Sequence, residues 1–133
     1  MIMSLSNALE TETLKWQFTT ASVTRPTAWY IALHTADPTD TGTVGEVTTG
    51  TDSAYVRQAV TFATPTGDTA LSNSSVAFTA NSGATTHVVT WYSIWSASTS
   101  GTCYGAGQLP VPITRVASAT LTFAPGDIAV TAD

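Results

Sequence analysis

The feature that most constrains this chain is a segment at residues 28–35, AWYIALHT, in which side chains of two kinds alternate. The large apolar side chains at every second position are Trp29, Ile31 and Leu33. The positions between them hold Tyr30, Ala32 and His34. Because successive side chains of a strand point to opposite faces, this period of two predicts a β-strand with one apolar face.

Similar segments recur along the chain. They are residues 54–64, 74–80, 87–97 and 102–109, and two short strands within 119–132 joined by a turn at Pro125, Gly126 and Asp127. In segment 54–64 the inward side chains are expected to be Val56, Val60 and Phe62. Segment 87–97 is the most apolar and is expected to be central, with one of two alternating sets facing the core. These sets are Val89, Trp91 and Trp95, or Val88, Tyr92 and Ile94.

About seven strands and one helix predict a mostly β protein, an antiparallel, jelly-roll-like β-sandwich with one N-terminal helix. The composition agrees, since roughly a fifth of the residues are threonine, which fits a pleated surface better than a helix. With 133 residues and no linker, we expect an N-terminal helical arm at residues 1–19 and a single β-sandwich domain at residues 20–133.

The low number of charged residues and the negative net charge of the chain limit the partners that it is expected to bind. Only 10% of the residues are charged, the net charge is −5, and four side chains are cationic, whereas phosphate binding needs a basic patch. We therefore expect no nucleic-acid partner. No apolar run approaches the roughly 18 residues of a membrane span, so no membrane partner is expected either. Cys103 is the single cysteine, which excludes an internal disulfide and a cysteine-based zinc cluster.

The predicted helix covers residues 4–18, SLSNALETETLKWQF. Ser4, Ser6 and Asn7 are suitable N-caps, and Asn7 with Glu10 has the spacing of a capping box. The apolar side chains of this helix pack either on the body of the same chain or on a neighbouring subunit. For the second alternative we expect Leu9, Trp16 and Phe18 to be the anchors.

The strand that ends at His34 continues into a long loop, residues 36–53, which is predicted to be a solvated surface loop that reaches a neighbouring subunit. Its acids are Asp37, Asp40, Glu46 and Asp52. Their spacing does not match a calcium-binding EF-hand loop, and one cysteine with two distant histidines does not form a zinc site. No serine stands out as the nucleophile of a Ser-His-Asp triad. We therefore expect no catalytic residue, no metal site and no cofactor, with His34 in a structural role.

Four tryptophans allow two interpretations. Aromatic rings stack on sugars, so Trp16, Trp29, Trp91 and Trp95 raise the hypothesis of a carbohydrate-binding module for a host surface glycan. Three of them lie on predicted strands beside other apolar residues, which favours core packing for each of the four.

Taken together, the segments resemble a family of short bacteriophage proteins described as tail fibre proteins. The most specific pieces are ALHTADP at residues 32–38 and PGDIAV at residues 125–130, and the resemblance covers nearly the whole chain. Ser96 departs from the family pattern, which often has Asp at this position, and Gly101-Thr102 replaces its usual glycine pair. The resemblance implies a virion structural protein with no catalytic residues. Because the N-terminus shows no signal-peptide pattern, we expect the protein to be made in the host cytoplasm.

We therefore expect a non-catalytic virion protein that is either a tail fibre component or a capsid cement protein. Its expected partners are further copies of itself, as a homotrimer, and another virion protein of the capsid or tail. The residues expected to contact a subunit or partner are Leu9, Trp16, Phe18, Asp37, Asp40 and Glu46. Host glycan binding is the alternative function.

Overall fold

The computed structural model describes the backbone of residues 2–132 and the side chains of residues 5–132. The elements in this range are β1 (Ile2–Leu5), α1 (Asn7–Phe18), β2 (Trp29–His34), β3 (Gln58–Val60), β4 (Thr69–Leu71), β5 (Val76–Thr79), β6 (His87–Trp95), β7 (Cys103–Arg115), β8 (Thr120–Phe123) and β9 (Ala129–Thr131). The two predicted parts, residues 1–19 and residues 20–133, include residues 1 and 133, which lie outside the described range.

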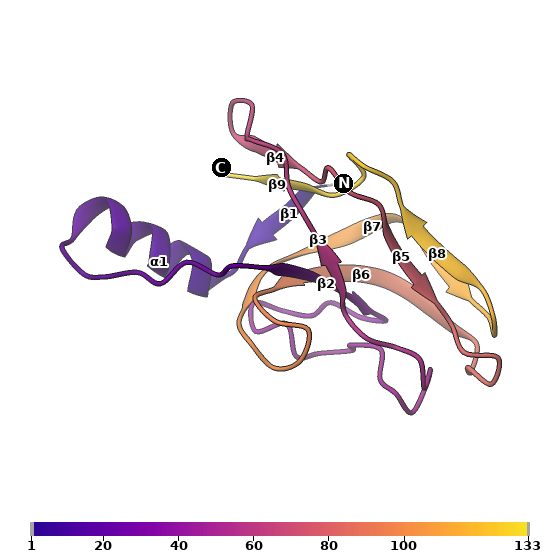
Figure 1. Cartoon of the computed structure of the whole chain (residues 1–133). Coiled ribbons are helices and arrows are strands. Elements are labelled where there is room, and N and C mark those ends of the chain that lie inside the picture. Colours follow the sequence, from indigo (N-terminus) through magenta and orange to yellow (C-terminus); the bar gives the residue numbers. More distant parts are fainter. Residues whose placement is uncertain (1, 133) are drawn as a thin grey trace.

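Seven strands form one sheet in the order β3-β2-β6-β7-β1-β9-β4, and β5 pairs with β8 in a second sheet. Neighbouring strands are antiparallel except β1 and β9, which are parallel. A bridge between Phe62 and Ser72 extends the chain between β3 and β4 into a hairpin, so the two edges of the large sheet come together. The mostly β, antiparallel, sandwich-like fold with one helix is confirmed (Figure 1).

The core lies between β5–β8 and the part of the large sheet made by β2, β6 and β7. Its largest buried members include Ile31, Leu33, Tyr92, Phe78 and Phe123. The rings of Phe78 and Phe123 meet edge to face, with their centroids 6.4 Å apart. The period-two alternation places Ile31 and Leu33 of β2, and Val76 and Phe78 of β5, on the core side of their strands, as expected for a sandwich.

Strand β6 does not follow either of the two predicted faces. Its pairing with β7 shifts register between Val89 and Trp91, so the alternation breaks there. Val89 from one predicted set and Tyr92 and Ile94 from the other are buried in the core. Such irregularities re-aim side chains within a strand, and a period of two assumed throughout misses them.

The N-terminal segment differs from the prediction. Residues 2–5 form strand β1 instead of the first turn of a helix, and the helix begins at Asn7. The N-cap is Ser6, whose Oγ accepts a hydrogen bond from the backbone N–H of Leu9 at 3.4 Å. The same hydroxyl donates to the carbonyl of Cys103 at 2.7 Å, which ties the helix start to β7.

The predicted strand at residues 54–64 is reduced to three residues, Gln58–Val60. Val60 is buried and Phe62 packs against the core, as predicted, but Val56 is 55% exposed. The prediction for Val56 is wrong because the chain before β3 is held by side-chain contacts of Tyr55 and Arg57 instead of by strand pairing.

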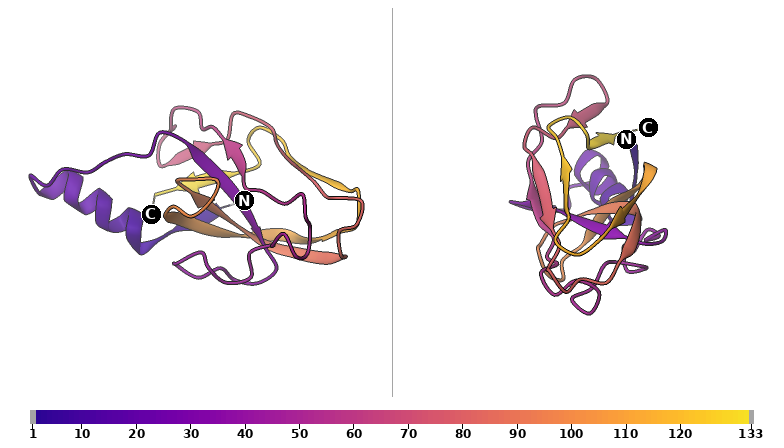
Figure 2. Two further views of the ribbon diagram at one scale, coloured as in Figure 1. Left: turned by 60° about the horizontal axis from the view of Figure 1, so that its bottom comes forward. Right: turned by 90° about the vertical axis from the view of Figure 1, so that its right-hand side faces the viewer.

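The helix projects from one end of the β-structure, and the segment after it runs back beside it to β2 (Figures 1 and 2). We refer to residues 7–28 as the arm and to the remaining strands and loops as the body. No residue of α1 is buried. The long loop after β2 instead lies on the body, where Gly42 is buried and a Cβ at this position would clash with Trp95 and Cys103.

Candidate functional site

The end of the helix carries three large apolar side chains that the body does not cover. Leu14 is 58% exposed, Trp16 is 70% exposed and Phe18 is 80% exposed. We refer to these three residues as the arm tip. Side chains of this size bring a large apolar area to any contact, and exposed groups of them mark interaction surfaces.

The arm is attached to the body through the first two turns of α1. The Tyr104 hydroxyl donates to both carboxylate oxygens of Glu12 at 3.1 Å. Partial burial, together with this carboxylate, raises the pKa of the Tyr104 phenol. The side-chain amide of Asn7 donates to Asp40 at 3.0 Å. A helix of this length is marginal alone, so these contacts and the cap help to hold it in place.

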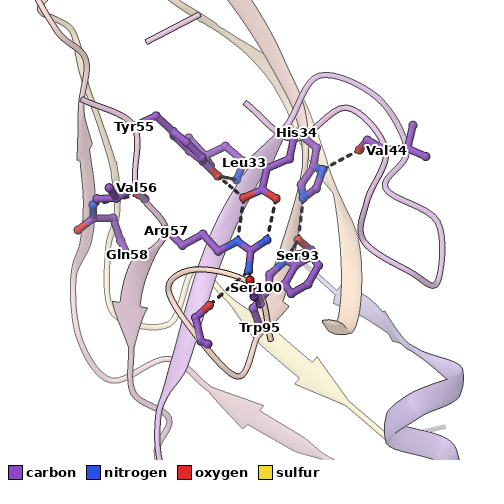
Figure 3. Close-up of polar contacts among 12 residues, drawn as sticks. Leu33, His34, Val44, Tyr55, Val56, Arg57, Gln58, Ser93, Trp95 and Ser100 are labelled. Carbon is purple, nitrogen blue, oxygen red and sulfur yellow. Dashed lines mark hydrogen bonds and ion pairs between the residues drawn. The ribbon is translucent and has the colours of Figure 1, made fainter. Parts of the chain in front are cut away.

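The loop after β2 is anchored by an ion pair between Glu46 and Arg57 (Figure 3). Arg57 Nε and Nη2 each donate to one oxygen of the carboxylate, both at 2.8 Å. Its Nη1 donates to the carbonyls of Ala97 and Ser100 at 3.3 and 2.7 Å. Its Cζ lies 3.6 Å from the centroid of the Trp95 ring. One arginine thus joins the loop, the chain before β3 and the β6–β7 turn.

Tyr55 completes this ion pair from the core side. Its hydroxyl donates to Glu46 Oε1 at 3.1 Å and accepts from the backbone N–H of Leu33 at 3.0 Å. Burial first, and the neighbouring Glu46 carboxylate second, raise the pKa of the Tyr55 phenol. The hydroxyl therefore stays protonated and holds the loop carboxylate against β2.

His34 is fully buried beside this network. Its Nδ1 faces the carbonyl of Val44 at 2.8 Å, and its Nε2 lies 2.7 Å from Ser93 Oγ. A carbonyl only accepts, so Nδ1 carries the proton and Nε2 accepts from Ser93. Burial is the main cause that lowers the pKa of His34. Both His34 and Ser93 are 0% exposed, so this contact is out of a substrate's reach and its role is structural.

A second ion pair, between Asp52 and Arg115, lies inside the body. Asp52 Oδ1 accepts from the backbone N–H groups of Ala54 and Asn81 at 3.1 and 2.9 Å. Arg115 Nη2 donates to the carbonyl of Phe78 at 3.1 Å. The two charged groups approach to 3.6 Å, with side chains 1% and 2% exposed. This pair fastens the loop to the end of β5 and to the end of β7.

Several apolar hollows lie on the surface. The Trp29 hollow, at the base of the arm, has a volume of about 490 Å³, and its lining includes Leu9, Trp29, Phe62 and Tyr104. Arg25 is the charged residue in this lining. The indole of Trp29 meets the Tyr104 ring edge to face, at 5.1 Å between centroids.

The Val111 groove lies between β7 and β8 and has a volume of about 410 Å³. Its apolar lining includes Leu109, Val111, Ile113 and Leu121. Val111 is 69% exposed. Asp127 is the charged residue in this lining.

The structure separates the residues that were expected to contact a partner. Trp16 and Phe18 lie at the arm tip, whereas Leu9 is half-buried at the arm base. Asp37 and Asp40 are exposed. Glu46 points inward to Arg57, with a side chain 22% exposed.

Two predictions about these side chains are wrong. The acids of residues 36–53 were expected to be solvated, but Asp52 is 1% exposed and Glu46 is engaged with Arg57. Core packing was expected for every tryptophan, and Trp16 is an exception because the helix that carries it projects from the body. The sequence analysis also missed Arg115, although a cation at the end of an apolar strand in a chain with so few charges is a usable signal.

Within residues 2–132, no three His, Cys, Asp or Glu side chains gather closely enough to hold a metal ion. No helix in this range is long and apolar enough to cross a membrane. The polar networks described above join the loop to the strands and turns beside it.

Comparison with protein families gives a match over almost the whole chain. A family model described as "Podophage GP4 fiber I protein gp80" matches residues 4–131. The arm, the loop and all strands except the first two residues of β1 fall within the matched residues. The comparison with curated proteins gave no match.

Proposed function

Because the chain belongs to the family described as podophage GP4 fiber I protein gp80, we propose that it is a non-catalytic building block of a bacteriophage tail fibre. The resemblance to phage tail fibre proteins is confirmed by this membership, which makes the chain a structural component of the virion. We further propose that the protein lies in the tail, is present in few copies and contacts other copies of itself.

The observation that supports an assembly role is the arm tip. A chain that worked alone would gain nothing from holding Leu14, Trp16 and Phe18 in water, because exposed apolar area favours association. We assign these side chains to contacts with further copies of the chain, as a homotrimer, and with another virion protein. Asp37 and Asp40 are exposed on the loop beside the arm base and are assigned to the rim of such a contact. Glu46 is assigned to holding the loop that presents them.

Quantitative mass spectrometry of purified virions tests the place in the tail. We expect a copy number far below that of the major capsid protein and divisible by three. A copy number close to that of the major capsid protein would instead identify a capsid cement protein. Absence from the particle would overturn the virion role.

A paired substitution tests the contact. Trp16→Ser with Phe18→Ser is expected to lower incorporation into virions at least several-fold, because it removes apolar area from the contact and not from the core. Leu71→Ser is the matched control, since Leu71 is 46% exposed and lies on β4, away from the arm. Equal incorporation of both variants would contradict the assignment.

A second candidate function is host glycan binding, and the Trp29 hollow is the observation that favours it. Trp29 and Tyr104 offer aromatic surface beside the cationic Arg25 in a hollow large enough for a small ligand. Titration with host polysaccharide, followed by tryptophan fluorescence, measures this directly. A signal that Trp29→Ala abolishes would establish the lectin role, and no signal across a glycan array would exclude it.

A further inference from the structure

The arm tip has a counterpart on the same chain. We propose that the arm tip of one copy docks in the Val111 groove of a second copy, an inference that specifies the self-contact within the proposed function. Leu14 and Phe18 lie four residues apart and share one face of α1, and this face is the part of the tip that enters the groove. The groove offers a concave apolar surface of about 410 Å³. The arm and strand β8 lie on opposite sides of the molecule (Figure 1). Each copy therefore carries both a protruding arm and, far from it, a groove that can accept the arm of another copy.

The groove is built to receive side chains. Val111 lies between Pro110 and Pro112, and the pairing of β7 with β6 has no partner residues between Gln108 and Ile113. Because proline has no backbone N–H, this segment cannot extend a sheet by adding a strand from another chain. Its exposed valine and the apolar floor beneath it remain available for a side-chain contact.

Charge selects this groove over the Trp29 hollow. Lys15 is the cation in the last turn of α1 and lies three residues before Phe18, beside the same face of the helix. The Trp29 hollow presents Arg25, which repels it, whereas the Val111 groove presents Asp127. An exposed ion pair adds little affinity, so burial of the apolar side chains stabilises the contact and the charges decide which groove is used.

The area available sets how many contacts are needed. A large aromatic side chain buries about 150–250 Å². Phe18, together with Leu14, therefore supplies only part of the roughly 800 Å² per partner that stable complexes bury. Each copy both donates a tip and accepts one, so a closed assembly such as the proposed trimer makes two such contacts per copy.

Disulfide trapping between two purified single-cysteine-addition variants tests the geometry. Gln17→Cys leaves the three apolar residues of the tip intact, and Thr122→Cys places a thiol on the exposed lining of the groove. The native Cys103 is buried and does not compete. After mixing and oxidation, we expect a covalent Gln17→Cys/Thr122→Cys dimer on non-reducing gels. The matched control replaces Thr122→Cys by Thr64→Cys, which lies in the lining of the Trp29 hollow.

The outcomes separate the alternatives. Crosslinking at Thr122→Cys at least several-fold faster than at Thr64→Cys supports the proposal. Preference for Thr64→Cys, equal rates or no crosslinking overturns it. The measurement uses the purified chain, so it can fail while virion incorporation stands, and absence from virions can sink the fibre assignment while the crosslink stands.

A charge cycle supplies the second readout. Lys15→Glu is expected to slow crosslinking several-fold when Asp127 is present. In an Asp127→Asn background, where the amide oxygen can still accept the bond from the Ala124 N–H, Lys15→Glu is expected to have little effect. Equal effects in both backgrounds would show that Lys15 and Asp127 do not meet, and would overturn the assignment of the groove.

Discussion

Two carboxylates of one loop, Glu46 and Asp52, each face an arginine, and the two pairs differ in almost every respect. The Glu46–Arg57 pair lies at the edge of the body, with side chains 22% and 9% exposed, and it is bidentate at 2.8 Å. The Asp52–Arg115 pair is buried, with its charged groups 3.6 Å apart. Asp52 Oδ2 and Arg115 Nε and Nη1 have no hydrogen-bond partner within the described chain.

Proximity of opposite charges does not by itself stabilise a fold. Removing two charges from water costs more than a loose contact returns, so the buried pair is worth little in itself. Removing only one member of the buried pair is strongly destabilising, because the remaining charge is then buried without an opposite charge. The edge pair has lower desolvation cost and better geometry, so its energy is carried by its own hydrogen bonds.

The largest effect is expected from Asp52→Ala. It leaves the buried Arg115 guanidinium unpaired and removes the acceptor of the Ala54 and Asn81 N–H groups, so we expect a loss of about 3–5 kcal/mol in the free energy of unfolding. Urea unfolding followed by tryptophan fluorescence measures it. A loss below about 1 kcal/mol, the size expected for an exposed ion pair, would show that the buried pair behaves like a surface pair.

A double substitution removes both charges of the buried pair. Asp52→Asn with Arg115→Met keeps an oxygen for the Ala54 and Asn81 N–H groups and leaves no unpaired charge in the interior. We expect the double variant to lose about 2 kcal/mol or less, and to be more stable than Asp52→Ala. A double variant less stable than Asp52→Ala would mean that the pair itself stabilises the fold.

At the edge pair, Arg57→Lys keeps the charge and removes the planar fork. The bidentate contact with Glu46 and the stacking on Trp95 are lost, for which we expect about 1–2 kcal/mol in the free energy of unfolding. Arg25→Lys is the matched control, because Arg25 is exposed on the arm. Equal effects of the two substitutions would show that the geometry of the edge pair does not matter.

A pH series probes the neutral neighbour of the edge pair. The pKa of His34 is lowered from its ordinary value of 6.5 mainly by burial, with Glu46 acting to raise it and Arg57 to lower it. The imidazole then binds a proton more readily in the unfolded chain than in the folded one. The contribution of His34 to the free energy of unfolding is therefore constant well above pH 6.5 and is lost as the pH drops through this value towards the folded pKa. Urea unfolding at several pH values measures this slope. His34→Gln is expected to flatten it, and an unchanged slope would assign it to other groups.

Features set by neighbouring residues in the sequence were predicted correctly, whereas features set by pairing with distant strands were not. Alternation places Ile31 and Leu33 correctly because each strand shows its own period. The register shift in β6 depends on how β7 pairs with it, and strand β1 forms only because β7 and β9 lie beside it. The sequence of residues 2–5 alone does not contain that information.

The same limit applies to the site. The exposed end of the helix was predictable as one of two alternatives, because the sequence left open whether the apolar side chains of the helix pack on the same chain or on a neighbouring subunit. The partners of Glu46 and Asp52 were not predictable, because Arg57 and Arg115 reach them through the tertiary fold. Four acids in a loop look alike in the sequence, and only the arginines distinguish them.

The smallest effect on stability is expected at the arm tip, where it contrasts with the largest effect on assembly. Trp16→Ser and Phe18→Ser remove side chains that are 70% and 80% exposed, so each should change the free energy of unfolding of the isolated chain by no more than about 0.5 kcal/mol. Light scattering and urea unfolding of the same preparations compare the two properties. A loss of self-association with unchanged stability assigns these aromatic residues to contacts between chains. A loss of stability comparable to that of Arg57→Lys would mean instead that the arm packs on its own body.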